Sequence, residues 1–216
     1  MPLYTADAVI LRTYKLGEAD RIVVFLTRDR GKKRGVAKGA RRPRSRFAAA
    51  LEPMTEVRLA YFEKERRELV GLNYAETVRS PLLLGTHDAL GYVGYFAELL
   101  DEWAQEADAD DRLYRLGASM LEALGAGAPV EPLARYFEYW LLRLQGVYPE
   151  ARGTLSGEAM AFLAASRSVT PQQVGDVPAS RQVLMELEQA HRALITMHLE
   201  KTLKSDRVLR DLRRHN

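Results

Sequence analysis

Short apolar runs separated by turn-forming residues make up the first 80 positions of the chain. Residues 8–11 form one apolar run, and residues 22–27 form a β-branched and aromatic run between polar segments that contain glycine. Residues 55–62 alternate polar and apolar side chains, which is typical of a half-buried strand. Segments 35–39 and 69–76 resemble two more strands, so the pattern predicts five short strands in about 75 residues and a small closed barrel.

The hydrophobic period changes after Ser80 and Pro81. Between Leu90 and Trp103, apolar residues recur every three or four positions, which is the spacing of one helix face. Similar patterns, with cap residues before them and glycine or proline after them, predict further helices. These helices are expected at residues 110–124, 132–144, 156–165 and about 180–213. The sequence therefore predicts an α+β protein with a strand domain in residues 1–80 and an all-helical domain in residues 81–216.

The two predicted domains differ in net charge. The net charge is +8 over residues 1–80 and −5 over residues 81–216, and within positions 28–46 Asp29 is the only acidic residue. A solvated loop is one explanation of such a basic run. We favour a surface that binds a polyanion, because so many like charges repel one another until an anion neutralises them. The predicted DNA-binding residues are Arg28, Arg30, Lys32, Lys33, Arg34, Lys38, Arg41, Arg42, Arg44 and Arg46.

Aromatic side chains are the second requirement for a site that binds single strands. Barrels of this kind combine a basic groove with rings on which bases stack. Phe25, Phe47, Tyr61 and Phe62 lie near the basic run, but they belong to apolar segments, so we expect most of them in the core. Arginine guanidinium planes are an alternative stacking surface.

A second basic face is expected near the end of the chain. Its residues recur every three or four positions and would share one side of the last predicted helix. They either complement the helix dipole or make a secondary DNA or partner contact. The residues are Lys201, Lys204, Arg207, Arg210 and Arg214.

Several chemistries are not expected. The chain has no cysteine, and His191 and His198 are seven positions apart, about 10 Å along a helix, so we predict no metal site and no cofactor. An acidic stretch could form a two-metal nuclease site, but we interpret it as a solvated linker at a helix end, and we predict that the protein is not an enzyme. The acidic residues are Glu98, Asp101, Glu102, Glu106, Asp108, Asp110 and Asp111.

No segment has the apolar length of a membrane span, and residues 1–7 lack the basic and apolar regions of a signal peptide. We therefore expect a cytoplasmic protein with no membrane partner.

Several segments, taken in their order along the chain, resemble the RecO family of bacterial recombination mediators. The resemblance lies in residues 8–12, 17–27, 31–39, 41–47 and 198–209. It implies an OB-fold barrel followed by a helical domain, and binding of single- and double-stranded DNA with annealing of complementary strands. It also implies RecR and the single-stranded DNA-binding protein as partners, with RecA loading as the outcome.

One departure from that family is visible in the sequence. Many members carry a four-cysteine zinc module after the Gly-x-x-Pro that follows the aromatic helix, here Gly146 to Pro149. This chain has no cysteine, so neither zinc nor a contact made through that module is expected. Two alternative functions stay open: a metal-dependent nucleic-acid enzyme and an OB-type RNA-binding protein.

Overall fold

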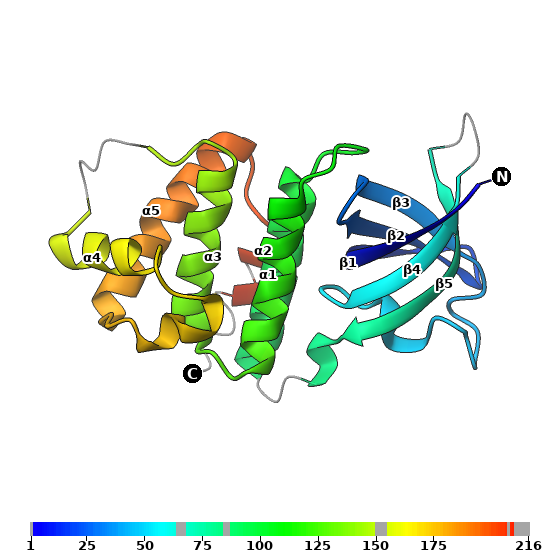
Figure 1. Cartoon of the computed structure of the whole chain (residues 1–216), viewed down its shortest axis with the longest axis horizontal. Helices are drawn as coiled ribbons and strands as arrows, with labels where there is room; N and C mark the ends of the chain where they lie inside the picture. Colours follow the sequence, from blue (N-terminus) through cyan, green and yellow to red (C-terminus); the bar gives the residue numbers. More distant parts are fainter. Residues whose placement is uncertain (1, 64–67, 84–86, 150–154, 207, 210–216) are drawn as a thin grey trace.

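The computed structural model describes residues 2–63, 68–83, 87–149, 155–206, 208 and 209. In this part of the chain, five strands form a closed barrel and a group of helices follows it, so the predicted α+β fold is confirmed. Figure 1 shows the barrel at one end of the molecule and α1 and α2 between the barrel and the other helices.

The strand order around the barrel is β1-β2-β3-β5-β4, closed by pairing of β1 with β4. The β3–β5 pair is parallel and the other neighbouring pairs are antiparallel. A five-stranded Greek-key barrel of this kind is OB-like, as the sequence resemblance implies. The strands are β1 (Leu3–Leu16), β2 (Asp20–Thr27), β3 (Gly31–Ala37), β4 (Glu56–Phe62) and β5 (Val70–Arg79).

The third strand begins earlier than its predicted range of 35–39. It starts at Gly31, which has a left-handed φ of +67° and closes the turn after β2. Lys32, Lys33 and Arg34 therefore belong to a strand. Their charge masks the strand pattern in the sequence.

The continuous apolar runs in β1 and β2 are explained by burial on both faces of these strands. Ala8, Ile10 and Phe25 belong to the barrel core, whereas Val9 and Leu26 pack in the core that the helices form. An alternating pattern is expected only where one face of a strand meets water. The outer face of this hairpin around Val9 and Leu26 is therefore the surface on which the helices dock.

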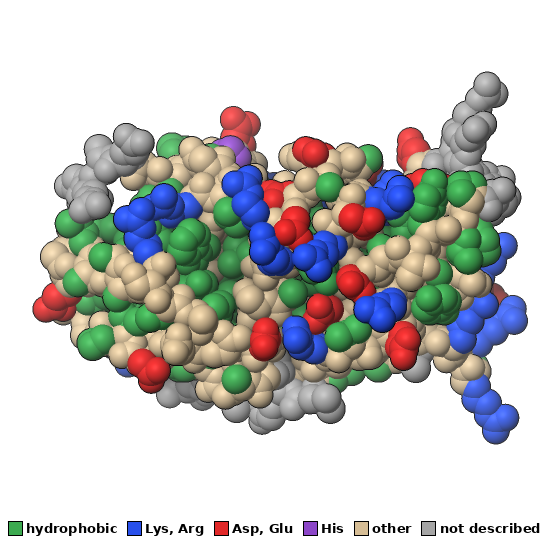
Figure 2. All heavy atoms as spheres, in the orientation of Figure 1, with side chains coloured by type: hydrophobic (Ala, Val, Ile, Leu, Met, Phe, Trp, Pro, Cys, Tyr) green, Lys and Arg blue, Asp and Glu red, His purple; other side chains and the backbone are tan. Residues whose placement is uncertain are grey.

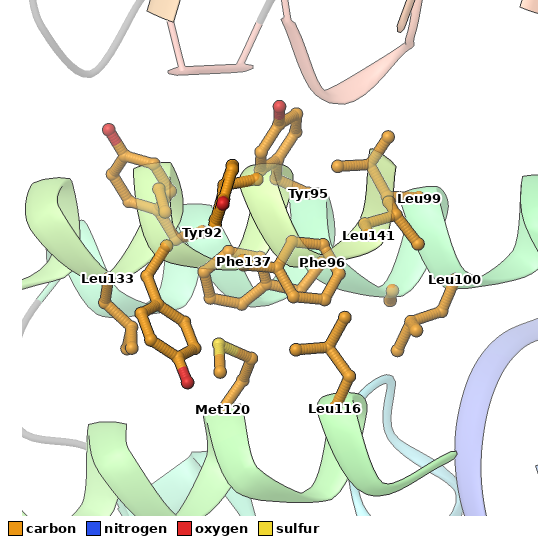
Figure 3. Close-up of a cluster of buried hydrophobic side chains, with 14 of the residues drawn as sticks. Tyr92, Tyr95, Phe96, Leu99, Leu100, Leu116, Met120, Leu133, Phe137 and Leu141 are labelled. Carbon is orange, nitrogen blue, oxygen red and sulfur yellow. The ribbon is translucent and has the colours of Figure 1, made fainter. Parts of the chain in front are cut away.

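The helices begin close to their predicted positions. The side chain of Asp110 accepts hydrogen bonds from the amides of Arg112 and Leu113, and Ser156 caps α4 in the same way. Aromatic and aliphatic residues of α1, α2 and α3 meet in the core shown in Figure 3, where the rings of Phe96 and Phe137 lie 4.7 Å apart. The helices are α1 (His87–Trp103), α2 (Asp111–Gly125), α3 (Val130–Leu144), α4 (Gly157–Ala165) and α5 (Arg181–Leu199), with 3-10 turns at Ala48–Leu51, Pro81–Leu83 and Pro171–Asp176.

The helix predicted at about residues 180–213 is shorter than expected. It ends at Leu199, not near residue 213, because Glu200 adopts a left-handed conformation with φ of 53°. The following chain turns back to α1, where the amides of Lys204 and Ser205 donate hydrogen bonds to the Glu98 carboxylate at 2.9 and 2.8 Å. The prediction failed because the residues after Leu199 keep a helical spacing while a tertiary contact redirects the backbone.

A network of buried charged groups joins α1, α3 and α5. Glu138 on α3 accepts hydrogen bonds from Arg135 at 2.7 Å and from the hydroxyl of Tyr95 at 2.7 Å, and its other oxygen lies 3.0 Å from Nδ1 of His191. Arg135 also contacts Glu188 of α5 at 3.1 Å. Burial and the neighbouring Glu138 raise the pKa of Tyr95 well above its ordinary value, so the hydroxyl remains a donor in this network.

Candidate nucleic-acid interface

The ten predicted DNA-binding residues separate into two groups in the structure. The first, which we call the paired group, makes ion pairs with acidic side chains: Arg28, Arg30, Lys32 and Lys33. The second, which we call the unpaired group, has no acidic partner within ion-pair distance among the described residues, and all its side chains are exposed: Arg34, Lys38, Arg41, Arg42, Arg44 and Arg46.

Two members of the paired group hold the barrel against the helices. Lys32 is only 16% exposed, and its ammonium lies 2.6 Å from the carbonyl oxygen and 3.4 Å from a carboxylate oxygen of Asp101 at the end of α1. Arg28 donates to Asp111 at the start of α2 at 2.8 Å, and this hydrogen bond raises the pKa of Arg28. The positive charge of both side chains is already matched within the protein.

The other two paired residues contact groups of the barrel itself. Lys33 forms an ion pair with Glu63, which follows β4, at 2.5 Å. Arg30 lies 3.6 Å from Asp29 and also 4.2 Å from the centre of the Tyr4 ring. A cation held over a ring in this way is stabilised by the ring quadrupole.

Most of the unpaired group lies on the segment that follows β3. This segment docks on the turn between β1 and β2: the amide of Gly39 donates to Asp20 at 2.8 Å, and Arg41 donates to the carbonyls of Ala19 and Gly17. Phe47 then enters the barrel core and is 1% exposed, which anchors the other end. The segment is thus held at both ends, and its arginine side chains between them are exposed.

Charged side chains are unevenly distributed over the face of the molecule drawn in Figure 2. Figure 2 shows basic side chains gathered at the edge of the molecule formed by the barrel, at the lower right. Over the middle of the same view, basic and acidic side chains are interleaved. The unpaired group is therefore the part of the predicted basic surface that is electrostatically open to an external anion.

The aromatic residues near the basic run lie mostly in the core, as expected. Phe25, Phe47 and Tyr61 are at most 1% exposed, and burial raises the pKa of Tyr61 to about 12. Sequence reasoning missed two exposed rings of the barrel, Tyr14 at 44% and Tyr74 at 38%. A tyrosine among charged neighbours within a strand is the signal that would have indicated Tyr14.

The second basic face on a last helix is not formed as predicted. Lys201 and Lys204 lie beyond the end of α5, and Lys201 forms an ion pair with Glu102 of α1. Arg207, Arg210 and Arg214 lie outside the described residues. The prediction that Lys201 and Lys204 lie on the same helix as residues 180–199 is therefore wrong, because that helix ends at Leu199.

The acidic stretch is not simply a solvated linker. Asp101 contacts Arg12 at 3.1 Å and Lys32 at 3.4 Å, Glu98 accepts from two backbone amides, and Asp110 caps α2. These carboxylates join the barrel, the helices and the segment after α5. Among the described residues, no group of three or more His, Cys, Asp or Glu side chains is arranged to hold a metal ion.

Comparisons with known proteins agree with the resemblance in the sequence. The family models described as "Recombination protein O N terminal" and "Recombination protein O C terminal" match residues 1–81 and 85–152. The DNA repair protein RecO of Nocardioides sp. is 36% identical, over 94% of this chain and 97% of that protein.

Two further relatives align over a smaller share of their length. The DNA repair protein RecO of Koribacter versatilis is 38% identical over 68% of this chain, and that of Anaeromyxobacter sp. (strain K) is 39% identical over 65%. The matches cover 61% and 56% of those relatives. In the described part of the chain, no helix is both long and apolar enough to cross a bilayer. Both family models match, and one relative aligns over nearly its full length. The chain therefore belongs to the RecO family of DNA repair proteins.

Proposed function

We propose that this protein binds single- and double-stranded DNA through the unpaired group and promotes annealing of complementary strands in recombination repair. The observation that carries the proposal is the set of exposed barrel cations that have no acidic partner among the described residues. DNA phosphates release condensed counterions when such cations bind them, which supplies affinity without sequence preference.

The finer parts of the proposal follow from the family. The protein acts in the cytoplasm with RecR and the single-stranded DNA-binding protein and helps to load RecA. It acts as a mediator and not as an enzyme. The structural roles of Glu98, Asp101 and Asp110 support this last point, because these carboxylates already bind protein groups.

The test is a charge reversal in the unpaired group, Arg41→Glu with Arg42→Glu and Arg44→Glu. We expect weaker binding to every sequence and a salt slope flatter by about 2 for single strands, since each phosphate contact contributes about 0.7. The matched control reverses Arg112, Arg167 and Arg181, which are exposed on the helical side of the molecule. Equal salt slopes for the two triple variants would place the DNA site elsewhere.

Annealing distinguishes the proposal from the two alternatives. Complementary oligonucleotides should anneal faster with the protein in the absence of ATP and divalent metal. Metal-dependent loss of labelled DNA would instead favour a nucleic-acid enzyme. Preferential competition by ribo-oligomers over deoxyribo-oligomers would favour an RNA-binding protein.

A further inference from the structure

An apolar row crosses the outer face of the barrel next to the unpaired group. Tyr14 of β1 is the cross-strand partner of Ile22 in β2, Ile22 pairs with Val36 in β3, and Val36 pairs with Gly71 in β5. Side chains directly opposite one another on neighbouring strands lie on the same face of a sheet. The adjacent residues Val23, Val70 and Leu72 belong to the barrel core, so this row faces outward.

A bulge in β1 places Tyr14 on this outer face. The register shifts between Ile10 and Arg12, after which Arg12 and Tyr14 follow the outward residues Val24 and Ile22 of β2. Without the extra residue, strand alternation would direct Tyr14 to the opposite side of the sheet. The ring is 44% exposed, an unusual position for an aromatic side chain on the face that the helices leave uncovered.

The Tyr14 ring is held in place by its hydroxyl. Arg12 donates to the hydroxyl at 3.2 Å and is itself fixed by Asp101 at 3.1 Å. Within the described residues, no other ring or cation stacks on Tyr14. The ring is thus oriented by the protein while 44% of the residue surface remains exposed to a ligand.

Unpaired cations flank the row. Arg34 lies two residues before Val36 in β3, about 6.6 Å away along the strand, and Lys38 is the first residue after the end of β3. At the other end, a Cβ added to Gly71 would meet nothing within 4 Å. The row therefore runs from the exposed Tyr14 through the half-buried Ile22 and Val36 to open space above Gly71, with positive charge beside Val36.

We propose that Tyr14, Ile22 and Val36 form a platform on which bases of single-stranded DNA stack while Arg34 and Lys38 bind the flanking phosphates. Stacking on protein rings requires bases that are not enclosed in a duplex. In this proposal the platform binds single strands only, whereas the arginines after β3 bind either form of DNA. This inference rests on the proposed function and assigns the strand-selective part of the same surface.

The second exposed tyrosine offers a matched control. Tyr74 lies on the outer face of β5 and is 38% exposed, close to the exposure of Tyr14. Its neighbours are Glu76, two residues along the strand, and Arg58, which is neutralised by Asp7 at 3.1 Å. Tyr74 therefore has the ring but not the free positive charge.

The test compares Tyr14→Leu with Tyr74→Leu in the full chain, using a fluorescent oligo-dT and a duplex of equal length. We expect Tyr14→Leu to weaken oligo-dT binding about fivefold or more, since stacking on one ring contributes at least about 1 kcal/mol. Duplex binding should not change. Tyr74→Leu should leave both affinities as they are, and Tyr14→Trp should restore single-strand binding.

A second pair of variants tests the platform without removing a side chain. Gly71→Glu and Gly71→Lys both project into open space next to Val36. The glutamate should lower oligo-dT affinity and the lysine should preserve or raise it. Thermal unfolding shows whether Tyr14→Leu folds. Should it not fold, the Gly71 pair still tests whether the platform binds oligo-dT.

Two outcomes would overturn the inference. One is unchanged oligo-dT binding by Tyr14→Leu and Gly71→Glu while the Arg41, Arg42 and Arg44 reversal still weakens binding; the proposed function then stands without the platform. The other is an equal loss on single strands and duplex. If DNA binding is unchanged in all these variants, including the Arg41, Arg42 and Arg44 reversal, the proposed function is contradicted as well.

Discussion

Arg135 in the helical domain and Arg42 after β3 show two opposite uses of the same side chain. Arg135 is 3% exposed, and its guanidinium binds Glu138 at 2.7 Å and Glu188 at 3.1 Å. Arg42 is exposed and has no acidic partner among the described residues. The comparison teaches that the number of basic residues in a region does not define a binding surface. The position of the carboxylates decides which cations are available.

The same contrast exists inside the barrel. Lys32 and Arg34 are two residues apart in β3 and face the same side. Lys32 forms an ion pair with Asp101 of α1, whereas Arg34 forms none with the described acidic side chains. Docking of the helices thus divides one basic strand into a structural part and an open part.

The largest expected effect is a loss of stability when the buried network around Arg135 is disrupted. Glu138→Ala removes the carboxylate that Arg135 and His191 share and leaves Arg135 with Glu188 alone, and removing one partner from a buried ion pair costs up to about 3–5 kcal/mol. Urea unfolding should show this loss in the free energy of unfolding. The matched change Glu131→Ala, at an exposed position of α3, should stay within about 1 kcal/mol. Similar losses for both variants would mean that the network contributes nothing specific.

An intermediate effect is expected from single changes at the DNA surface. Arg42→Ala should flatten the salt slope for single strands by about 0.7, while Arg28→Ala should change it less because Asp111 already neutralises Arg28. Asp111→Asn sharpens the comparison, since it frees Arg28 and should strengthen DNA binding. Salt-dependent fluorescence anisotropy measures all three. A larger effect of Arg28→Ala than of Arg42→Ala would contradict the division into paired and unpaired groups.

The smallest expected effect is a pH dependence at Glu98. Burial opposes ionisation there, but hydrogen bonds from Ser205 and from the amide of Lys204 outweigh it and lower the pKa of Glu98 below its ordinary value of 4.5. A lowered folded-state pKa means that ionised Glu98 stabilises the fold above pH 4.5 and that this contribution is lost as pH falls through the folded-state pKa.

Glu98→Gln removes this titration. The variant should lose less stability than the wild type when unfolding is compared at about pH 6 and at about pH 3.5. Urea unfolding at the two pH values measures the difference. The same pH dependence in both proteins would show that the contact between Glu98 and the segment after α5 does not contribute to stability in solution.

The spacing of hydrophobic residues along the chain predicted most helices and strands, because this spacing reflects the local geometry of each one. The alternation of residues 55–62 and the helical spacing from Leu90 to Trp103 each describe a single element with one solvent-facing side. The runs in β1 and β2 gave the strands but not their double burial, because the second covering surface comes from distant helices. The helix expected to reach residue 213 ended at Leu199 because a contact with Glu98 redirects the chain.

By itself, the sequence determined the barrel followed by helices, the concentration of positive charge in residues 28–46 and the resemblance to the RecO family. These properties depend on composition and on local periodicity. Only the tertiary structure decided which of those cations are neutralised, because Asp101 and Asp111 reach them from helices more than 60 positions away in the chain. It also decided that Tyr14 faces outward beside the open charge, because that orientation depends on a bulge and on the pairing of three strands.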